Sequence, residues 1–199
     1  MSEKDLLRRS YRAARRALSP EDQCEHALAV ADEVMRRLDD GATVAAYLAR
    51  DGEVDLIGVI EACWRRHIVV ALPVLSGREM RFAEYRPGTP LVRNRFGIAE
   101  PSAGVREGLA PFEKEPAQPE FVAPDVVLAP LVAFDDRGRR LGMGGGYYDR
   151  FFAATPDAAR IGIAHECQRA PALPATSSDV SLTSVVTETG WQDFCVSLK

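Results

Sequence analysis

The sequence lacks the features that mark secreted, membrane-spanning and zinc-stapled proteins. Four cysteines, at positions 24, 63, 167 and 195, occur among 199 residues without a CxxC pair or a histidine at ligand spacing. They indicate neither a disulfide framework nor a zinc site, and are interpreted as reduced structural thiols. No apolar run approaches the roughly 18 to 20 residues that span a bilayer, and the amino-terminal segment lacks the apolar core of a signal peptide. We therefore expect a cytoplasmic protein without membrane association.

An excess of basic over acidic side chains is confined to one segment. The net charge is −4, but residues 1–18 hold six basic and two acidic side chains, which leaves −8 on the rest of the chain. Binding to duplex nucleic acid requires a broad cationic surface, so this distribution disfavours a nucleic-acid partner. One basic helix is better suited to a small polyanion. The three histidines, His26, His67 and His165, match no functional pattern and are interpreted as structural.

Repeats, low-complexity tracts and long linkers are also missing, so we expect residues 1–199 to form a single domain. With 46% hydrophobic and 27% charged residues, the composition is typical of a globular protein. A chain of this length buries about 70% of its unfolded surface, which is enough for a core without metal or disulfide support.

Hydrophobic patterns alternate between helical and strand periods. Helices are predicted over residues 3–18, 20–39, 55–66 (with Asp55 as the cap) and 147–154. Strands are predicted over 43–48, 68–72, 80–85, 90–93, 126–134, 161–164 and 184–187, with 80–85 and 90–93 paired as a hairpin and 97–124 as a surface excursion. This order predicts an α/β fold with a mostly parallel sheet and helices on both faces, in a doubly wound, Rossmann-like arrangement. Such folds bind ligands at the carboxyl ends of their strands.

The segment after the most apolar strand, Arg140 to Asp149, carries the strongest functional signal. Its glycines let backbone amides approach a ligand, as phosphate-binding loops do, and the following helix adds the positive end of its dipole. Arg140 supplies a cation and Asp149 an oxygen ligand for magnesium. The alternative is a flexible glycine loop in which Asp149 only stabilises the helix start, since neither GxxxxGK[ST] nor GxGxxG is present. The glycines are Gly142, Gly144, Gly145 and Gly146.

The run FDDRGRRLGMGGGYYDRF at 134–151 closely resembles the hallmark segment of the 5-formyltetrahydrofolate cyclo-ligase family, also known as 5,10-methenyltetrahydrofolate synthetases. The resemblance extends over nearly the whole chain, through KxxxR, YLxxxxEVD, ALPV, FGIAEP at 96–101, and Asp179 before SVVTE. It implies a NagB/RpiA/CoA-transferase-like architecture and an ATP-driven cyclisation of 5-formyltetrahydrofolate to 5,10-methenyltetrahydrofolate. In that reaction the γ-phosphate activates the formyl oxygen before N10 attacks the carbon.

The resemblance also implies roles for individual residues, with ATP and Mg²⁺ as cofactors and a folate as substrate. The expected catalytic residues are Arg140, Tyr148 and Asp149. The expected ATP-binding residues are Lys4, Arg8, Arg140, Leu141, Gly142, Met143, Gly144, Gly145, Gly146, Tyr147 and Tyr148. The folate is expected to contact Leu48, Glu53, Phe96 and Tyr148, and Asp149 and Asp179 are expected to hold the metal. The helices within residues 1–40 are expected to close over the ATP site, and the enzyme to be a monomer.

Simpler interpretations exist for several of these residues. Spacing alone would assign Lys4 and Arg8 to a solvated basic face, on the edge of an apolar helical stripe. Glu53 could be a solvated loop acid, Phe96 a core residue and Asp179 a loop cap. The stripe is formed by Leu7, Tyr11, Ala14 and Leu18, and the remaining basic residues of the helix, Arg9, Arg12, Arg15 and Arg16, are interpreted as surface charges.

Two positions depart from the family pattern. Met143 and Gly145 leave the loop uncharged where some members carry a basic residue, and Thr183 stands where a second acid often follows Asp179. We expect both to weaken ATP or metal binding. Two rival functions are a sugar-phosphate isomerase or CoA-transferase-like enzyme of related fold, and a non-catalytic folate- or nucleotide-binding module.

Overall fold

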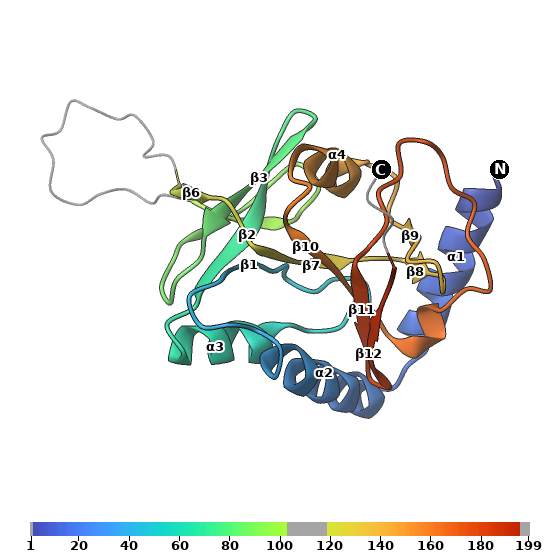
Figure 1. Ribbon diagram of the computed structural model, residues 1–199, viewed down its shortest axis with the longest axis horizontal. Helices are drawn as coiled ribbons and strands as arrows, with labels where there is room; N and C mark the ends of the chain where they lie inside the picture. Colours follow the sequence, from blue (N-terminus) through green and yellow to red (C-terminus); the bar gives the residue numbers. More distant parts are fainter. Residues whose placement is uncertain (1, 103–118, 196–199) are drawn as a thin grey trace, which may run out of the picture.

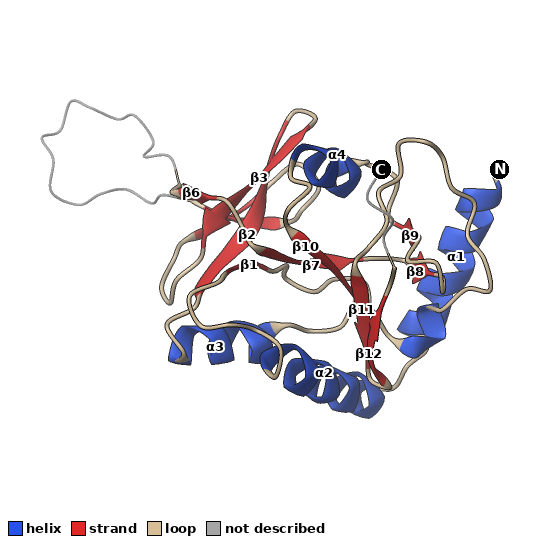
Figure 2. Ribbon diagram, in the orientation of Figure 1, coloured by secondary structure: helices blue, strands red, loops and turns tan. Residues whose placement is uncertain are grey.

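The computed structural model describes residues 2–102 and 119–195, and an eight-stranded sheet runs through it (Figures 1 and 2). The strand order is β12-β11-β10-β7-β1-β2-β3-β6. The five neighbours from β11 to β2 are parallel, while β12 pairs antiparallel with β11, β3 with β2 and β6 with β3, which confirms the mostly parallel sheet. The strands are β1 (Thr43–Ala45), β2 (Val69–Ser76), β3 (Glu79–Glu84), β6 (Phe121–Val122), β7 (Val126–Pro130), β10 (Ala159–Ile163), β11 (Ser184–Thr187) and β12 (Gly190–Asp193).

Helices cover both faces of this sheet, as predicted (Figure 2). On one face the helices α2 (Pro20–Met35) and α3 (Ile57–Arg65) bury Val30, Val34 and Ile60 against the strands. On the other face α4 (Tyr147–Ala154) buries Phe152 beside Phe82 of β3. These two apolar layers fix the sheet from both sides and hold the ends of its strands in place.

The first helix, α1 (Glu3–Arg16), lies at one end of the molecule (Figure 1). Ser2 caps it in a reciprocal capping box with Asp5, and Ser19 caps α2 in the same way with Asp22. Leu7 and Tyr11 of α1 pack against a small cluster beneath the hairpin of β8 (Ala133–Phe134) and β9 (Arg140–Leu141). The apolar stripe predicted on this helix therefore docks it onto the hairpin that leads into the glycine loop.

The strand order reverses direction between β1 and β7. From β1 the chain proceeds through β2 to one edge of the sheet, whereas β7, β10 and β11 follow one another toward the other edge. In doubly wound folds the crevice at such a switch point, outside the carboxyl ends of the strands, is the usual ligand site. Here the loop after β1 contains Asp51 and Glu53, and the segment after β7 leads to the glycine loop.

Some local predictions were wrong. The predicted strand 126–134 is divided, because Pro130 ends β7 without an N–H to continue the ladder and β8 pairs with β9 instead. The predicted hairpin of 80–85 with 90–93 does not form: β3 pairs with β2 through the turn at Gly77, while β4 (Leu91–Arg93) pairs with β5 (Ala99–Pro101). The expected excursion at 97–124 contains β5 and β6, and its residues 103–118 lie outside the described residues.

Candidate active site at the glycine loop

The loop between β9 and α4 needs its glycines for two different physical reasons. Gly144 and Gly146 adopt positive φ angles of +96° and +66°, which L residues with side chains rarely adopt. Gly142 and Gly145 have ordinary φ but no spare volume: a Cβ at Gly142 would lie 2.9 Å from Arg140 Nη1, and one at Gly145 would lie 2.9 Å from the Tyr147 ring. The backbone of the loop is therefore packed directly against the side chains of Arg140 and Tyr147.

Arg140 is held almost entirely inside the site, with its side chain 4% exposed. Its Nη2 donates to Asp149 Oδ1 at 2.9 Å, and its guanidinium carbon lies 5.4 Å from the centre of the Tyr148 ring. Its buried Nε has no hydrogen-bond partner among the described residues. Buried polar groups are almost always paired, so an unpartnered guanidinium N–H indicates a place for an anionic ligand. The residues expected to be catalytic, Arg140, Tyr148 and Asp149, thus lie in contact with one another.

Residues of α1 reach the same loop. Arg8 Nε donates to the Gly142 carbonyl oxygen at 2.9 Å, and its guanidinium lies 3.4 Å from where a Cβ at Gly144 would be. Lys4 Nζ lies 2.9 Å from Asp179 Oδ2. Both basic side chains are partly buried and contact other segments, Arg8 the glycine loop and Lys4 the segment at Asp179, so they do not form the solvated face that spacing alone would allow.

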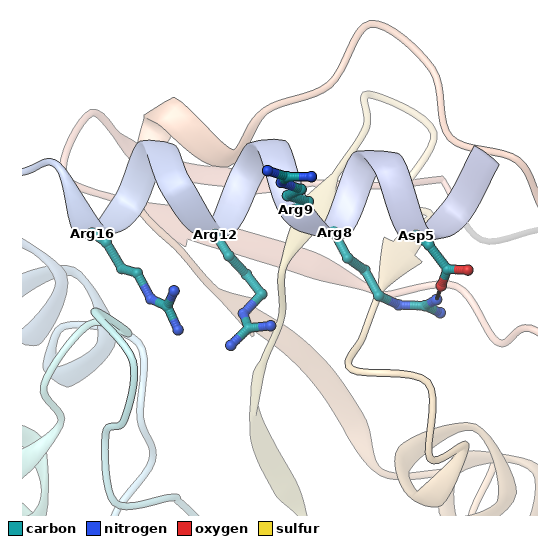
Figure 3. Close-up of a pocket in the computed structure, with 5 residues that line it drawn as sticks. All are labelled: Asp5, Arg8, Arg9, Arg12 and Arg16. Atoms are coloured by element: carbon teal, nitrogen blue, oxygen red, sulfur yellow. Dashed lines mark hydrogen bonds and ion pairs between the residues drawn. The ribbon is translucent and has the colours of Figure 1, made fainter. Parts of the chain in front are cut away.

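A pocket of about 270 Å³ lies against α1, and Arg8, Arg12 and Arg16 project into it from one side of the helix because they are four residues apart (Figure 3). Arg9 and Asp5 complete the lining, and Asp5 forms an ion pair with Arg8. Four guanidinium groups lie against two carboxylates, Asp5 and Asp51, so the pocket keeps an excess of positive charge that favours a polyanion. Only α1 of the two N-terminal helices lines it: α2 packs on α3, β11 and β12 instead, because its apolar residues face the core.

Arg15 does not lie on the surface as expected, since it is 1% exposed. Its Nε donates to the Asp51 carbonyl oxygen at 2.8 Å, and its Nη1 donates to the Leu131 carbonyl oxygen at 2.9 Å. It therefore occupies the switch-point crevice and joins α1 to the segments that follow β1 and β7. Its spacing of four residues from Tyr11 was the sequence signal for this inward position.

Arg12 and Arg16 are not free surface charges either. Both form ion pairs with Asp51, which also accepts from Arg15 Nη2 at 3.0 Å. Burial opposes ionisation of Asp51, but hydrogen bonds from these three arginines outweigh it and lower its pKa to about 2. Asp51 is thus a fixed anion that clamps the carboxyl-terminal half of α1 to the loop after β1.

Glu53 lies in the same loop and is not a solvated acid. It accepts from the Arg50 backbone N–H at 3.0 Å, and its Oε1 lies 3.5 Å from Arg15 Nη2. Burial raises the pKa of Glu53 despite the charge of Arg15. Burial also raises the pKa of Tyr148, and the negative charge of Glu53 adds to that rise while Arg140 opposes it. The electrostatic coupling of Glu53 to Tyr148 links the loop after β1 with α4.

The aromatic residue expected at the folate is not part of the core. Phe96 is 48% exposed, and its ring lies edge-on to Tyr147 with 6.4 Å between ring centres. Its carbonyl oxygen accepts from Arg50 at 3.1 Å. Leu48 is partly buried and packs against the main core cluster. Phe96 is therefore next to the glycine loop although 51 residues of chain separate it from Tyr147.

Asp149 lies close to the segment that carries Asp179. Its Oδ1 is 3.5 Å from the backbone nitrogen of Val180, the residue that follows Asp179. Burial opposes ionisation of Asp179, but hydrogen bonds from Lys4 and the Thr176 backbone lower its pKa below the usual value. The two carboxylates are 25% and 28% exposed. Two partly exposed carboxylates, each beside a basic side chain, fit Mg²⁺, which binds through one or two carboxylates together with substrate phosphates.

The two departures from the family pattern have structural explanations. Met143 is 58% exposed, and the loop obtains a cation from α4 instead: Arg150 Nη2 donates to the Gly145 carbonyl oxygen at 2.9 Å. Sequence analysis missed Arg150, although it follows Asp149 directly. Thr183 lies outside the site, since its hydroxyl pairs with the backbone of Arg160 at the start of β10.

The fold and this site define a doubly wound α/β enzyme with a cationic, phosphate-type pocket beside its switch point. The model of the 5-formyltetrahydrofolate cyclo-ligase family matches residues 1–188. The chain belongs to this family, whose activity is the ATP-dependent conversion of 5-formyltetrahydrofolate to 5,10-methenyltetrahydrofolate. The predicted family, fold class and enzyme class are confirmed.

Similar proteins agree with this assignment. The chain is 40% identical over 187 residues to the 5-formyltetrahydrofolate cyclo-ligase of Escherichia coli strain K12, covering 88% of this chain and 95% of that one. It is 36% identical over 148 residues to that of Haemophilus influenzae, covering 72% and 74%. The solution structure of Aquifex aeolicus 5,10-methenyltetrahydrofolate synthetase matches with a TM-score of 0.78 at 27% identity, covering 100% and 96%. A synthetase from Mycoplasma pneumoniae, at 22% identity, shares the fold with a TM-score of 0.72, covering 94% and 99%.

Proposed function

We propose that the chain cyclises 5-formyltetrahydrofolate in the space between α1, the glycine loop and α4, with ATP as phosphoryl donor and ADP and phosphate as further products. The observation that carries this placement is the unpartnered, buried Nε of Arg140, which lies beside the glycine loop that Arg8 also contacts. A triphosphate oxygen would supply the acceptor that Arg140 Nε lacks.

ATP binds along the cationic pocket in this proposal. Lys4 and Arg8 contact phosphate oxygens from α1, and Arg140 contacts them from β9. The backbone from Leu141 through Met143 and Gly145 to Tyr148 would bind the phosphates beyond this pocket, next to the contact of Arg8 with Gly142. The glycine loop leads directly into α4, whose dipole would place partial positive charge toward the phosphates.

Asp149 and Asp179 would hold Mg²⁺, which when bound neutralises phosphate charge. For this to happen Asp149 must share its carboxylate between Arg140 and the metal, and Asp179 must release Lys4 to the phosphates. The site is thus charge-balanced before ligands arrive: each acid proposed to bind the metal already has a basic partner proposed to bind ATP.

The folate lies on the Glu53 side of the site. Phe96 offers an exposed ring for stacking, Leu48 an apolar contact and Tyr148 a wall shared with ATP. The raised pKa of Glu53 indicates a carboxyl group in a dry environment, where a hydrogen bond to a pterin N–H is strong.

The protein contributes to this reaction mainly by positioning the reactants, rather than by forming covalent bonds to them. The γ-phosphoryl group passes from ATP to the formyl oxygen, which leaves ADP and makes the formyl carbon electrophilic. N10 then forms a bond to that carbon, the carbon–oxygen bond breaks, phosphate departs and N10 loses its proton. The contribution of Arg140 and its neighbours is to hold the reactants in line and to stabilise charge on the transferred group.

The test is the absorbance of the methenyl product when 5-formyltetrahydrofolate, ATP and Mg²⁺ are added together, with ADP measured in parallel. Wild type should form product and ADP in equal amounts, and Asp149→Ala should lose most turnover while remaining folded. A protein that binds both ligands without turnover would be a binding module, and this result would contradict the proposal.

The expected monomeric state and cytoplasmic location remain predictions. In the described ranges, 2–102 and 119–195, no helix has the length and apolarity of a membrane span.

A further inference from the structure

Two histidines interpreted as structural form a compact group with an acid from a third segment. His26 lies on α2, His165 directly precedes the short helix η1 (Glu166–Gln168), and Glu188 lies in the turn between β11 and β12. The Nδ1 atoms of the two histidines are 2.9 Å apart, and His26 Nδ1 lies 3.6 Å from Glu188 Oε1. Within the ranges 2–102 and 119–195, no other cluster gathers three potential metal ligands from His, Cys, Asp and Glu.

The spacing of these atoms is close to that of ligand atoms around a metal ion. Zinc binds histidine nitrogen and carboxylate oxygen at about 2.0 to 2.2 Å in tetrahedral sites, which places neighbouring ligand atoms about 3.3 to 3.5 Å apart. The two separations, 2.9 and 3.6 Å, fall on either side of that range, and all three ligand atoms lie within 4.8 Å of one another. Small side-chain adjustments would therefore complete three corners of a tetrahedron.

The surroundings hold the ligands but leave an opening. Both carboxylate oxygens of Glu188 accept from the Glu166 backbone N–H, at 3.2 and 2.9 Å. The backbone of His165 is fixed by Gln168, and the His165 side chain is fully buried. His26 and Glu188 are each about one-fifth exposed. Outer hydrogen bonds of this kind orient metal ligands, while the partial exposure admits an ion and a water molecule as fourth ligand.

We propose that His26, His165 and Glu188 bind a divalent transition-metal ion of the zinc type. Two imidazoles and one carboxylate favour zinc over magnesium, which prefers oxygen ligands. The bound ion ties α2 to the β11–β12 turn and to η1, which contacts α1. It stabilises the end of the sheet on which α1 rests, and it is separate from Asp149 and Asp179.

The test uses full-length protein treated with a chelator, with the chelator then removed, and no ATP or folate present. Co²⁺ alone should bind at one equivalent with the visible absorption of tetrahedral cobalt, and Zn²⁺ should displace it. His26→Gln and Glu188→Gln, both at partly exposed positions, should weaken binding at least tenfold with unchanged circular dichroism. His67→Asn is the matched control and should bind as wild type does; Asn suits the positive φ of 58° at that position.

Zinc should also raise the melting temperature of wild type and of His67→Asn, but not of the two ligand variants, because an ion that binds only the native state stabilises it. Absence of the cobalt spectrum in wild type, or equal affinity in the ligand variants, would overturn the proposal and leave a histidine–histidine hydrogen bond. Because neither readout involves turnover, the outcome is independent of the proposed reaction.

Discussion

The Nζ atom of Lys4 lies 2.9 Å from Oδ2 of Asp179, so a proposed ATP ligand and a proposed metal ligand neutralise each other across 175 residues of chain. The pair joins the first turn of α1 to the loop before β11. Both side chains are about one-quarter exposed, which places their contact at the rim of the site rather than in the core.

Lys4→Ala should raise the KM for ATP about tenfold or more, because a hydrogen bond between charged groups contributes roughly 1.5 to 3 kcal/mol. The free energy of unfolding should change by less than about 1 kcal/mol, since partly exposed ion pairs contribute little. Steady-state kinetics and urea unfolding measure the two effects. Arg36→Ala, on the exposed end of α2, is the control and should leave the KM unchanged. An unchanged KM in Lys4→Ala would remove this residue from the ATP site.

Gly142→Ala should impair ATP binding without unfolding the protein. The backbone at Gly142 is compatible with alanine, but the added Cβ would lie 2.9 Å from Arg140 Nη1 and displace that guanidinium. We expect the KM for ATP to rise about tenfold, equivalent to the loss of one charged hydrogen bond. Gly58→Ala, in α3 with its nearest neighbour 3.9 Å away, is the matched control and should be neutral or slightly stabilising. Equal kinetics for the two variants would contradict the packing of Arg140 on the loop.

Arg15→Met should destabilise the protein by about 2 to 4 kcal/mol, because the buried carbonyl groups of Asp51 and Leu131 would lose their donor. Arg9→Met changes an exposed residue of the same helix and should have an effect within about 0.5 kcal/mol. Chemical denaturation of both variants provides the comparison. Similar midpoints would show that the buried contacts of Arg15 contribute nothing measurable.

Asp51 should make the enzyme sensitive to acid. Its pKa is lowered from 3.8 to about 2 in the folded state, so the unfolded chain takes up a proton first as the pH falls. The stabilisation is complete above about pH 4 and is lost as the pH falls toward 2. Unfolding free energies measured from pH 6 to pH 2.5 should therefore decline more steeply for wild type than for Asp51→Asn. Parallel curves for the two proteins would be inconsistent with the arginine clamp.

The sequence predicted the elements with strong periodicity and the loop with special chemistry. The buried parallel strands and the stripe of Leu7 and Tyr11 follow directly from apolar spacing, and the glycine loop follows from composition. Pairing of the short strands β4, β5, β8 and β9 was not predictable, because two or three residues carry too little pattern to choose a partner. Contacts between distant segments could not be predicted either, as the burial of Arg15 shows. A basic residue on a basic helix is predicted to be a surface charge as long as the loop that contacts it is unknown.

The histidines are a second case in which a contact between distant segments could not be predicted from the sequence. His26 and His165 are 139 residues apart, so no spacing rule could bring them together. The fold brings them together, because α2 covers the face of the sheet whose strand end carries His165.

The amino end of α1 has a practical consequence for recombinant work. Ser2 caps the helix only two residues before Lys4, and Arg8 lies one turn further on beside Gly142. A purification tag joined ahead of Ser2 would emerge next to the proposed triphosphate site, where acidic or histidine-rich linkers would compete for the arginines or for the proposed metal. Kinetic constants should therefore be measured after such a tag has been cleaved off.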